Sequence, residues 1–140
     1  FTIGNHEQRI TRAVNDDPKL EGLMSYEDFN LKQYGWEVLP FLQVATIDGI
    51  CYAHYFTSGV MGRPVSSARA LLTKKHQSCV MGHVQDRDIA FVGICYQHDE
   101  GYLTPQTNGS WRGLWVLNDV ENGAFDELPV SLTYLEREHG

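Results

Sequence analysis

The chain opens on the stretch Phe1-Thr2-Ile3-Gly4-Asn5-His6-Glu7. The first three residues predict a short strand, and the glycine and asparagine that follow favour a turn. From Glu7 to Val14 the apolar residues recur on one helical face, which predicts a helix. A strand that stops at an amide and an imidazole is typical of α/β domains, in which ligands gather where strands end.

Two later strand-like runs end in the same way. Cys51-Tyr52-Ala53 is followed by His54, and Val80-Met81-Gly82 is followed by His83. Taken singly, a histidine at a strand end is an ordinary feature of folded proteins. Three strand-like runs that each end at such a polar residue are stronger evidence for a metal site. Imidazole nitrogen and amide oxygen are ligands for Mn²⁺, Zn²⁺ or Fe²⁺. We therefore expect Asn5 and the two histidines to converge at one edge of a sheet.

The remaining pattern predicts alternating helices and strands in the first half of the chain and mostly strands in the second. Asp48-Gly49 between two apolar runs is a strong hairpin signal, and Glu121-Asn122-Gly123 predicts a second hairpin turn. This order predicts the α/β class: a mixed β-sandwich flanked by helices, formed as a single domain by residues 1–140. Beyond the first helix, we expect helices at 25–35 and 65–75, strands at 36–39, 42–47, 50–54, 77–81, 89–96, 111–120 and 124–132, and a frayed tail at 134–140.

Composition narrows the possible partners and the location. Asp and Glu outnumber Lys and Arg 18 to 11, which gives a formal net charge of −7. Because sequence-independent affinity for nucleic acid comes mainly from Lys and Arg, this charge gives no support to a nucleic-acid partner. No apolar run is long enough for a membrane span. Three cysteines without a Cys-x-x-Cys pair indicate buried thiols and a cytoplasmic setting.

From Phe1 to about Leu135 the chain resembles the C-terminal half of the calcineurin-like metallophosphoesterases. In that family an Asn-His turn is followed by a strand ending in His and then by a Gly-His-x-His motif. Gly4-Asn5-His6-Glu7, His54 and Gly82-His83 stand in this order here. The resemblance implies a metallophosphoesterase-like fold and a hydrolase of phosphomonoesters or phosphodiesters that uses a binuclear centre of Mn²⁺, Fe²⁺ or Zn²⁺.

The resemblance also implies a ligand set. Asn5, His54 and His83 would hold one metal of the pair. Gln85 stands where the family has the last histidine of Gly-His-x-His, and its amide oxygen would be a weaker, neutral donor.

Two further roles follow from the same resemblance. His6, next to the ligand asparagine, would be the general acid that protonates the leaving alkoxide. Glu7 would orient this histidine or start the helix that follows. Arg63 and Arg87 flank the second and third sites, where they either bind substrate phosphate or lie solvated in loops.

The chain departs from the family pattern in one half of the metal centre. Asp-x-His and Gly-Asp-x-x-Asp, which supply the other metal's ligands and the bridging carboxylate, do not occur in these 140 residues. We therefore expect an incomplete half-site that holds at most one metal tightly and hydrolyses phosphoesters poorly by itself. We also expect the family's N-terminal strands to be missing beside Phe1-Thr2-Ile3. The open apolar edge would favour a homodimer or a complementing N-terminal fragment.

Two other interpretations stay open. A degenerate, non-catalytic family member that acts as a binding or assembly module would account for the missing carboxylates and for Gln85. A generic α/β interaction domain in which the short motifs occur by coincidence is the third, because short motifs carry a risk of false matches.

Overall fold

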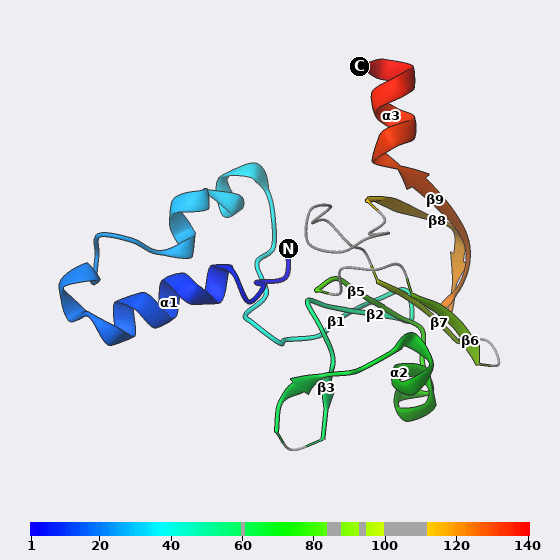
Figure 1. Ribbon diagram of the computed structural model, residues 1–140, viewed down its shortest axis with the longest axis horizontal. Coiled ribbons are helices and arrows are strands. Elements are labelled where there is room, and N and C mark those ends of the chain that lie inside the picture. The colour runs from blue at the N-terminus through cyan, green and yellow to red at the C-terminus, as the bar shows by residue number, and fades with distance from the viewer. Residues whose placement is uncertain (60, 84–87, 93–94, 100–111) are drawn as a thin grey trace. The chain divides into compact units, whose positions relative to one another are not determined.

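The computed structural model describes residues 1–59, 61–83, 88–92, 95–99 and 112–140. The chain divides into two compact units, unit 1 (Phe1–Val44) and unit 2 (Ala45–Gly140), which are described separately (Figure 1). The helices and the small sheets together confirm the predicted α/β class. That residues 1–140 form a single domain stays a prediction.

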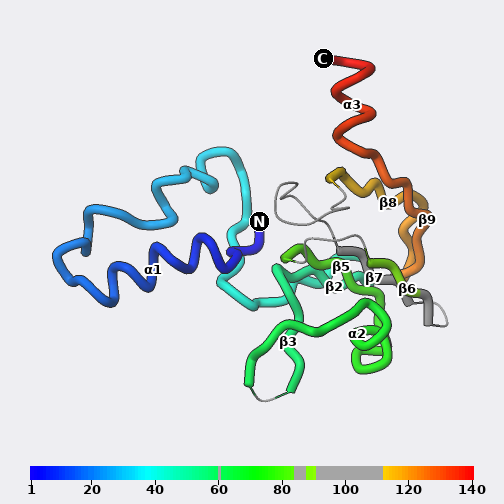
Figure 2. Tube along the Cα trace, viewed as in Figure 1, coloured from blue at the N-terminus to red at the C-terminus, as the bar shows by residue number. Residues whose placement is uncertain are grey.

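Unit 1 contains one α-helix followed by three short 3₁₀ helices. The helix α1 spans Glu7–Asp16, so the helix predicted from Glu7 is confirmed. Figure 2 shows α1 leaving the N-terminus in blue and the chain returning in cyan. The 3₁₀ helices are η1 (Pro18–Leu20), η2 (Tyr26–Phe29) and η3 (Leu31–Tyr34).

The helical stretch predicted at 25–35 forms as η2 and η3, and Ser25 caps its first turn. The Ser25 hydroxyl accepts the N–H of Glu27 at 3.0 Å, and the Asp28 carboxylate accepts the N–H of Ser25 at 2.8 Å. These two bonds complete a capping box. Gly35 ends η3 at φ +79°, a left-handed conformation that glycine adopts without steric cost.

The first residues of unit 1 pair with Leu39. Thr2 and Leu39 form a parallel bridge, in which the N–H of Ile3 donates to the carbonyl of Leu39 at 3.0 Å. The N–H of Leu39 donates in turn to the carbonyl of Phe1 at 2.8 Å. The prediction of a strand at 36–39 is therefore wrong about the length of the paired segment. It is reduced to an isolated bridge, because its first two residues are exposed rather than buried on a sheet face.

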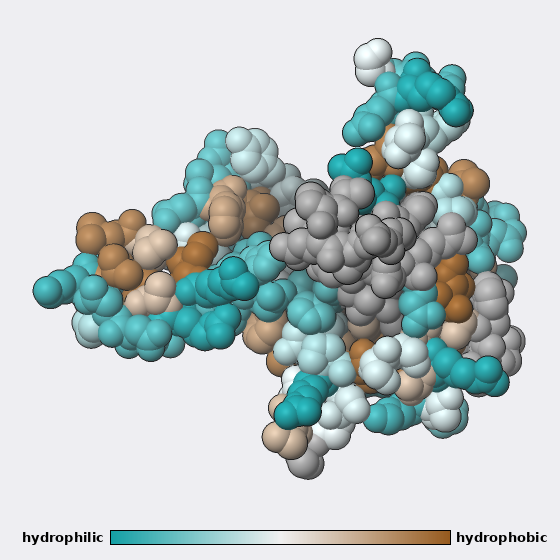
Figure 3. Space-filling model, viewed as in Figure 1, coloured by the Kyte–Doolittle hydropathy of each residue, from teal (hydrophilic) through white to brown (hydrophobic). Residues whose placement is uncertain are grey.

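Unit 1 buries little apolar surface. Of the buried apolar side chains, only Ile3 belongs to it, with 3% of its surface exposed. Figure 3 shows apolar residues, in brown, on the visible surface of this unit. A unit of this size with so small a core is too small to be stable by itself without further contacts. Its exposed large apolar residues are Phe1, Leu23, Met24, Phe29, Tyr34, Trp36 and Val44.

Unit 2 is built on a five-stranded sheet. Its strands are β1 (Ala45–Ile47), β2 (Ile50–Ala53), β5 (Cys79–Met81), β6 (Ile89–Val92) and β7 (Cys95–Asp99). They lie in the order β1-β2-β5-β7-β6, with β2, β5 and β7 parallel and the two outer strands antiparallel to their neighbours. The connection from β2 to β5 contains the short ribbon β3 (Thr57–Ser58) and β4 (Arg63–Pro64), and then the helix α2 (Ala68–Lys75).

The core of unit 2 forms between α2 and one face of the sheet. The helix buries Ala68, Leu71 and Leu72, and it packs against β6 and β7 (Figure 1). Burying each leucine side chain contributes about 1.5–3 kcal/mol. The alternating positions of β2 and β5 face this core, so Cys51 and Cys79 are the buried thiols that the sequence predicts.

Two hairpin turns pack against each other at the end of the sheet where β2 and β5 begin. The strands β8 (Gly113–Glu121) and β9 (Ala124–Ser131) form the second hairpin, so both predicted hairpins are confirmed. The N–H of Gly123 donates to the carbonyl of Asp48 at 2.8 Å, and the buried Ser78 hydroxyl donates to the carbonyl of Gly123. These bonds fix the tip of the β8–β9 ribbon to the β1–β2 turn.

Two predictions for the second half of the chain are wrong. Residues 89–96 do not form one strand, because β6 and β7 pair antiparallel with Val92 opposite Cys95. The tail is not frayed: Leu132–His139 forms the helix α3, and the Ser131 hydroxyl caps it by accepting the N–H of Tyr134 at 3.1 Å. In the described part of the chain, no helix is both long and apolar enough to cross a membrane.

The residue that ends α2 has an unfavourable backbone conformation for its type. His76 follows the helix at φ +51° and is exposed, and its N–H donates to the carbonyl of Leu72 at 2.9 Å. Glycine is the residue that most readily adopts this left-handed position. We expect His76→Gly to raise the free energy of unfolding by about 0.5–1 kcal/mol. Chemical denaturation measures the change; His76→Ala, which keeps the Cβ, should give no such gain.

Candidate metal site at the sheet edge

The carboxyl ends of three parallel strands define one edge of the sheet in unit 2. Ala53, Met81 and Asp99 are the last residues of β2, β5 and β7, and they stand in register with one another. His54 follows β2 directly, and His83 follows β5 after one glycine. The edge at which ligands gather in α/β sheets therefore carries two of the predicted metal ligands.

The two imidazole rings are in contact. Nε2 of His54 lies 3.2 Å from Nδ1 of His83, and the ring planes meet at 75°. Two nitrogens that each lie about 2.1 Å from one metal, at octahedral or tetrahedral angles, are about 3.0–3.4 Å apart. The observed separation therefore suits a shared cation as well as a hydrogen bond between the rings. Both residues are half-buried, so the cluster is open to ions from solvent.

A third ring, that of Tyr55, packs on this pair. Its centroid lies 4.8 Å from that of His83 and 5.8 Å from that of His54. Aromatic contacts at these distances are favourable and restrict how far the imidazoles can turn. Tyr55 was not among the residues predicted for the site, although its position directly after the predicted ligand His54 was a signal that could have identified it.

The chain turns at the end of β5 through a histidine in the left-handed region. His83 has φ +79°, a conformation that costs a residue with a Cβ about 1–2 kcal/mol. The preceding Gly82, the residue type that adopts this region most readily, is not among the residues with positive φ. A Cβ added to Gly82 would approach no atom closer than 4.0 Å, the distance to the carbonyl oxygen of His54. The residue that adopts the unfavourable left-handed conformation is therefore His83, the candidate ligand itself.

The remaining predicted residues of the first motif belong to unit 1. Asn5 is half-buried, and His6 is exposed at the N-cap position of α1. The Glu7 carboxylate accepts the N–H of Gly4 at 2.8 Å, which supports the interpretation that Glu7 starts the helix. Since Asn5 and the two histidines lie in different units, their convergence stays a prediction.

Three further residues were predicted for the site: the phosphate-binding Arg63 and Arg87, and the weaker ligand Gln85. Arg63 is exposed in β4, where it stands opposite Ser58 of β3 in the connection that follows His54. Gln85 and Arg87 lie outside the described residues. The roles of all three stay predictions.

The donor set at the sheet edge is partial. Among the described residues, no three His, Cys, Asp or Glu side chains come together in a way that could hold a metal ion. The two imidazoles are nonetheless suitable ligands for Zn²⁺, Fe²⁺ or Mn²⁺. The donors present fit one divalent cation, and they bring no negative charge to offset it.

One ionisable side chain on β2 has a shifted pKa. Burial, with a smaller effect from the Asp48 carboxylate, raises the pKa of Tyr52 above its ordinary value. A tyrosine phenol is already protonated at neutral pH and this shift keeps it protonated, so β2 contributes no anionic oxygen from this position.

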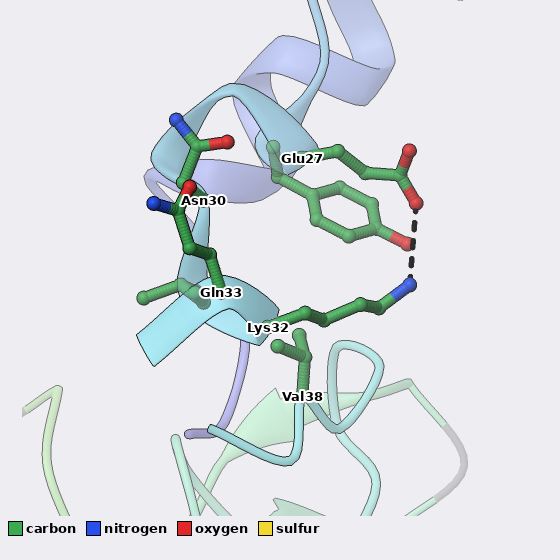
Figure 4. A pocket seen from close by; sticks show the side chains of 7 residues that line it. Glu27, Asn30, Lys32, Gln33 and Val38 are labelled. Atoms are coloured by element: carbon green, nitrogen blue, oxygen red, sulfur yellow. Dashed lines mark hydrogen bonds and ion pairs between the residues drawn. The ribbon is translucent and has the colours of Figure 1, made fainter. Parts of the chain in front are cut away.

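Unit 1 contains a pocket whose lining side chains differ in type from those at the sheet edge of unit 2 (Figure 4). Its volume is about 280 Å³. The ion pair between Lys32 Nζ and Glu27 Oε1, 3.4 Å long, spans one side of it. Both side chains are largely exposed, so the pair contributes only about 0–1 kcal/mol. The lining offers amides and one ion pair but no histidine or cysteine: Tyr26, Glu27, Asn30, Leu31, Lys32, Gln33 and Val38.

Comparison with known proteins adds no relative. No protein-family model, curated protein or solved structure gives a significant match to the chain. A function can therefore be proposed only from the residues of the chain and the geometry of the sheet edge.

Proposed function

We propose that the chain is a metal-dependent hydrolase of phosphomonoesters or phosphodiesters. The observation that carries the proposal is the pair of ring nitrogens, Nε2 of His54 and Nδ1 of His83, 3.2 Å apart at the carboxyl ends of adjacent parallel strands. The proposal includes the metallophosphoesterase-like fold that the sequence resembles, a mixed β-sandwich flanked by helices. Because the chain holds ligands for one half of a binuclear centre, the proposed site is a half-site.

In this proposal the two histidines bind one divalent cation, Mn²⁺, Fe²⁺ or Zn²⁺, through neutral ring nitrogens. The amide oxygen of Asn5 is the third donor, and Gln85 is a weaker one. The ring of Tyr55 restrains the imidazoles by packing against them. A bound divalent cation supplies Lewis-acid polarisation of a phosphoryl oxygen.

His6 supplies the proton in the same proposal. Its exposed imidazole would donate a ring N–H proton to the leaving alkoxide oxygen as the P–O bond breaks, while the oxygen of an attacking water molecule bonds to phosphorus and releases a proton to solvent. Arg63 and Arg87 bind the oxygens of the substrate phosphate that do not react, since guanidinium groups match phosphate geometry.

A second candidate function is a non-catalytic binding or assembly module. The observation that favours it is the exposed apolar surface of unit 1, in which Ile3 is the one buried apolar side chain. Such surfaces mark sites of protein association. A chain that forms a homodimer and shows no hydrolysis when loaded with Mn²⁺ would support this module over the enzyme.

Zn²⁺ titration of the purified chain tests the metal site. We expect one Zn²⁺ per chain and at least about tenfold weaker binding in His54→Ala and in His83→Ala, because each variant removes one of few donors. The same preparations, supplied with Mn²⁺ and an aryl phosphate, should hydrolyse the ester slowly. Isothermal titration calorimetry measures the first quantity, and release of the phenol measures the second.

Two exposed histidines outside the cluster provide matched controls. His76→Ala and His139→Ala should bind Zn²⁺ as the unsubstituted chain does. Unchanged binding in both His54→Ala and His83→Ala would contradict the metal site. Fast hydrolysis by a monomer would contradict the half-site and indicate a complete enzyme.

A further inference from the structure

One stretch of the chain carries positive charge without negative charge. Residues 49–85 contain four of the 11 Lys and Arg residues, Arg63, Arg69, Lys74 and Lys75, and none of the 18 Asp and Glu residues. The chain as a whole has a formal net charge of −7, so its basic residues are concentrated in a part of the sequence that has no acidic ones. An uneven distribution of this kind decides which charged partners a surface attracts.

Three of these cations gather where the end of α2 meets the ribbon of β3 and β4 (Figure 1). Lys74 Nζ donates to the Ser58 hydroxyl at 3.1 Å, and Lys75 Nζ lies 5.6 Å from the centroid of the Phe56 ring. Arg63 of β4 stands opposite Ser58 of β3, and directly paired residues of an antiparallel ribbon share a face. Arg63, Lys74 and Lys75 therefore form one surface, called here the basic surface.

The charges of the basic surface are not neutralised by acidic side chains of the described residues. All three cations are exposed. The ion pairs that the described residues form lie elsewhere, between η2 and η3 and within α3. The acceptor of Lys74 is a neutral hydroxyl, so its full charge remains available to an anionic partner. Because salt screens charges beyond about 8 Å at physiological ionic strength, the negative net charge of the chain does not cancel this local attraction.

The turn that joins β3 to β4 adds an exposed apolar side chain. Met61 is 74% exposed, and Gly59 and Gly62 on either side of it both have φ +66°. Cations beside an exposed apolar side chain suit a phospholipid surface, which offers anionic headgroups above an apolar layer. A single-stranded nucleic acid would instead require exposed rings for base stacking, and the Phe56 ring beside Lys75 is buried.

We infer that the basic surface and Met61 bind the surface of an anionic phospholipid membrane. The cations contact the headgroups, and Met61 enters the boundary between headgroups and acyl chains. The binding is reversible and depends on salt, because three cations and one apolar side chain are fewer than a stable anchor needs. The inference does not rest on the proposed hydrolase. Since Arg63 is also proposed to bind substrate phosphate, the variants that test the inference change the lysines and Met61 instead.

Sedimentation with vesicles tests the inference. Vesicles of phosphatidylcholine and phosphatidylserine in equal parts, at about 0.05 M salt, should bind the chain, and vesicles of phosphatidylcholine alone should not. The double variant Lys74→Gln/Lys75→Gln should lower the partition coefficient about 25-fold, because each basic side chain near an anionic surface contributes about fivefold. Met61→Ala should lower it about fivefold through lost apolar contact. Added salt should weaken binding of the unsubstituted chain more than binding of the double variant.

Unit 1 provides matched controls. Lys19→Gln/Lys32→Gln makes the same change in net charge outside the basic surface, and Met24→Ala shortens another exposed methionine. Both variants should bind the vesicles as the unsubstituted chain does. Equal weakening in the two double lysine variants would show that net charge alone governs binding and would overturn the inference. Failure of the unsubstituted chain to bind phosphatidylserine vesicles would overturn it as well.

A fluorescent single-stranded RNA tests the other polyanion that a basic surface could attract. We expect its anisotropy to stay unchanged at chain concentrations that saturate the vesicles. RNA binding that Lys74→Gln/Lys75→Gln abolishes, without vesicle binding, would overturn the membrane inference and assign the basic surface to nucleic acid. Circular dichroism checks that each variant is folded: the two lysines and Met61 are exposed, so their substitution should leave the spectrum unchanged.

Discussion

Replacing Gly49 with alanine is expected to lower the free energy of unfolding by about 3–6 kcal/mol. Gly49 has φ +82°, and a Cβ added to it would lie 2.5 Å from the backbone nitrogen of Gly123. The left-handed conformation costs about 1–2 kcal/mol, and relieving the overlap costs about 1–3 kcal/mol. Moving the turn also lengthens the 2.8 Å bond from Gly123 to the Asp48 carbonyl, which contributes about 1 kcal/mol. Urea unfolding followed by circular dichroism measures the loss.

A glycine in open space separates the two causes. Gly59 also has a positive φ, +66°, but an added Cβ would meet nothing within 4 Å. Gly59→Ala should therefore cost only the conformational part, about 1–2 kcal/mol. Gly123→Ala should behave like Gly49→Ala, because its Cβ would lie 2.8 Å from the carbonyl oxygen of Gly49. Equal losses in Gly59→Ala and Gly49→Ala would show that the contact between the turns contributes nothing.

Turn and cap chemistry made part of this fold predictable. Asp48-Gly49 and Asn122-Gly123 both have two consecutive residues with positive φ, which is what their composition favours in a tight hairpin. Ser25 and Gly35 marked the ends of a helical stretch for equally local reasons. The packing of one hairpin turn on the other joins residues more than 70 positions apart, and no local pattern predicts such a contact.

The errors of prediction have physical causes as well. An apolar run such as 89–96 is compatible with one buried strand or with two paired ones, because periodicity alone does not show a turn. Gly93-Ile94, the Gly-x pair between Val92 and Cys95, was a hairpin signal that the prediction passed over. The C-terminal helix α3 has no buried residue, so its sequence carried only a weak apolar pattern.

Part of the candidate site was likewise predictable from the sequence, and part was not. His54 and His83 were identifiable because each ends an apolar run, and parallel pairing of β2 with β5 brings such ends to one edge. The Asp88 carboxylate accepts the N–H of Ala68 at the start of α2 at 2.7 Å, and this helix cap was not identifiable, because its partner is a backbone N–H supplied by the tertiary fold.

In a preparation that hydrolyses an aryl phosphate with Mn²⁺, His6→Ala is expected to lower turnover by about 10²–10⁴-fold, the usual contribution of a general acid. The metal content, measured by elemental analysis, should stay nearly unchanged, because His6 is proposed to act on the leaving group and not on the cation. His83→Ala should instead lose bound metal, since its Nδ1 faces Nε2 of His54 at 3.2 Å. Equal loss of metal in both variants would mean that His6 is a ligand or a structural residue. The general acid would then have to come from another side chain.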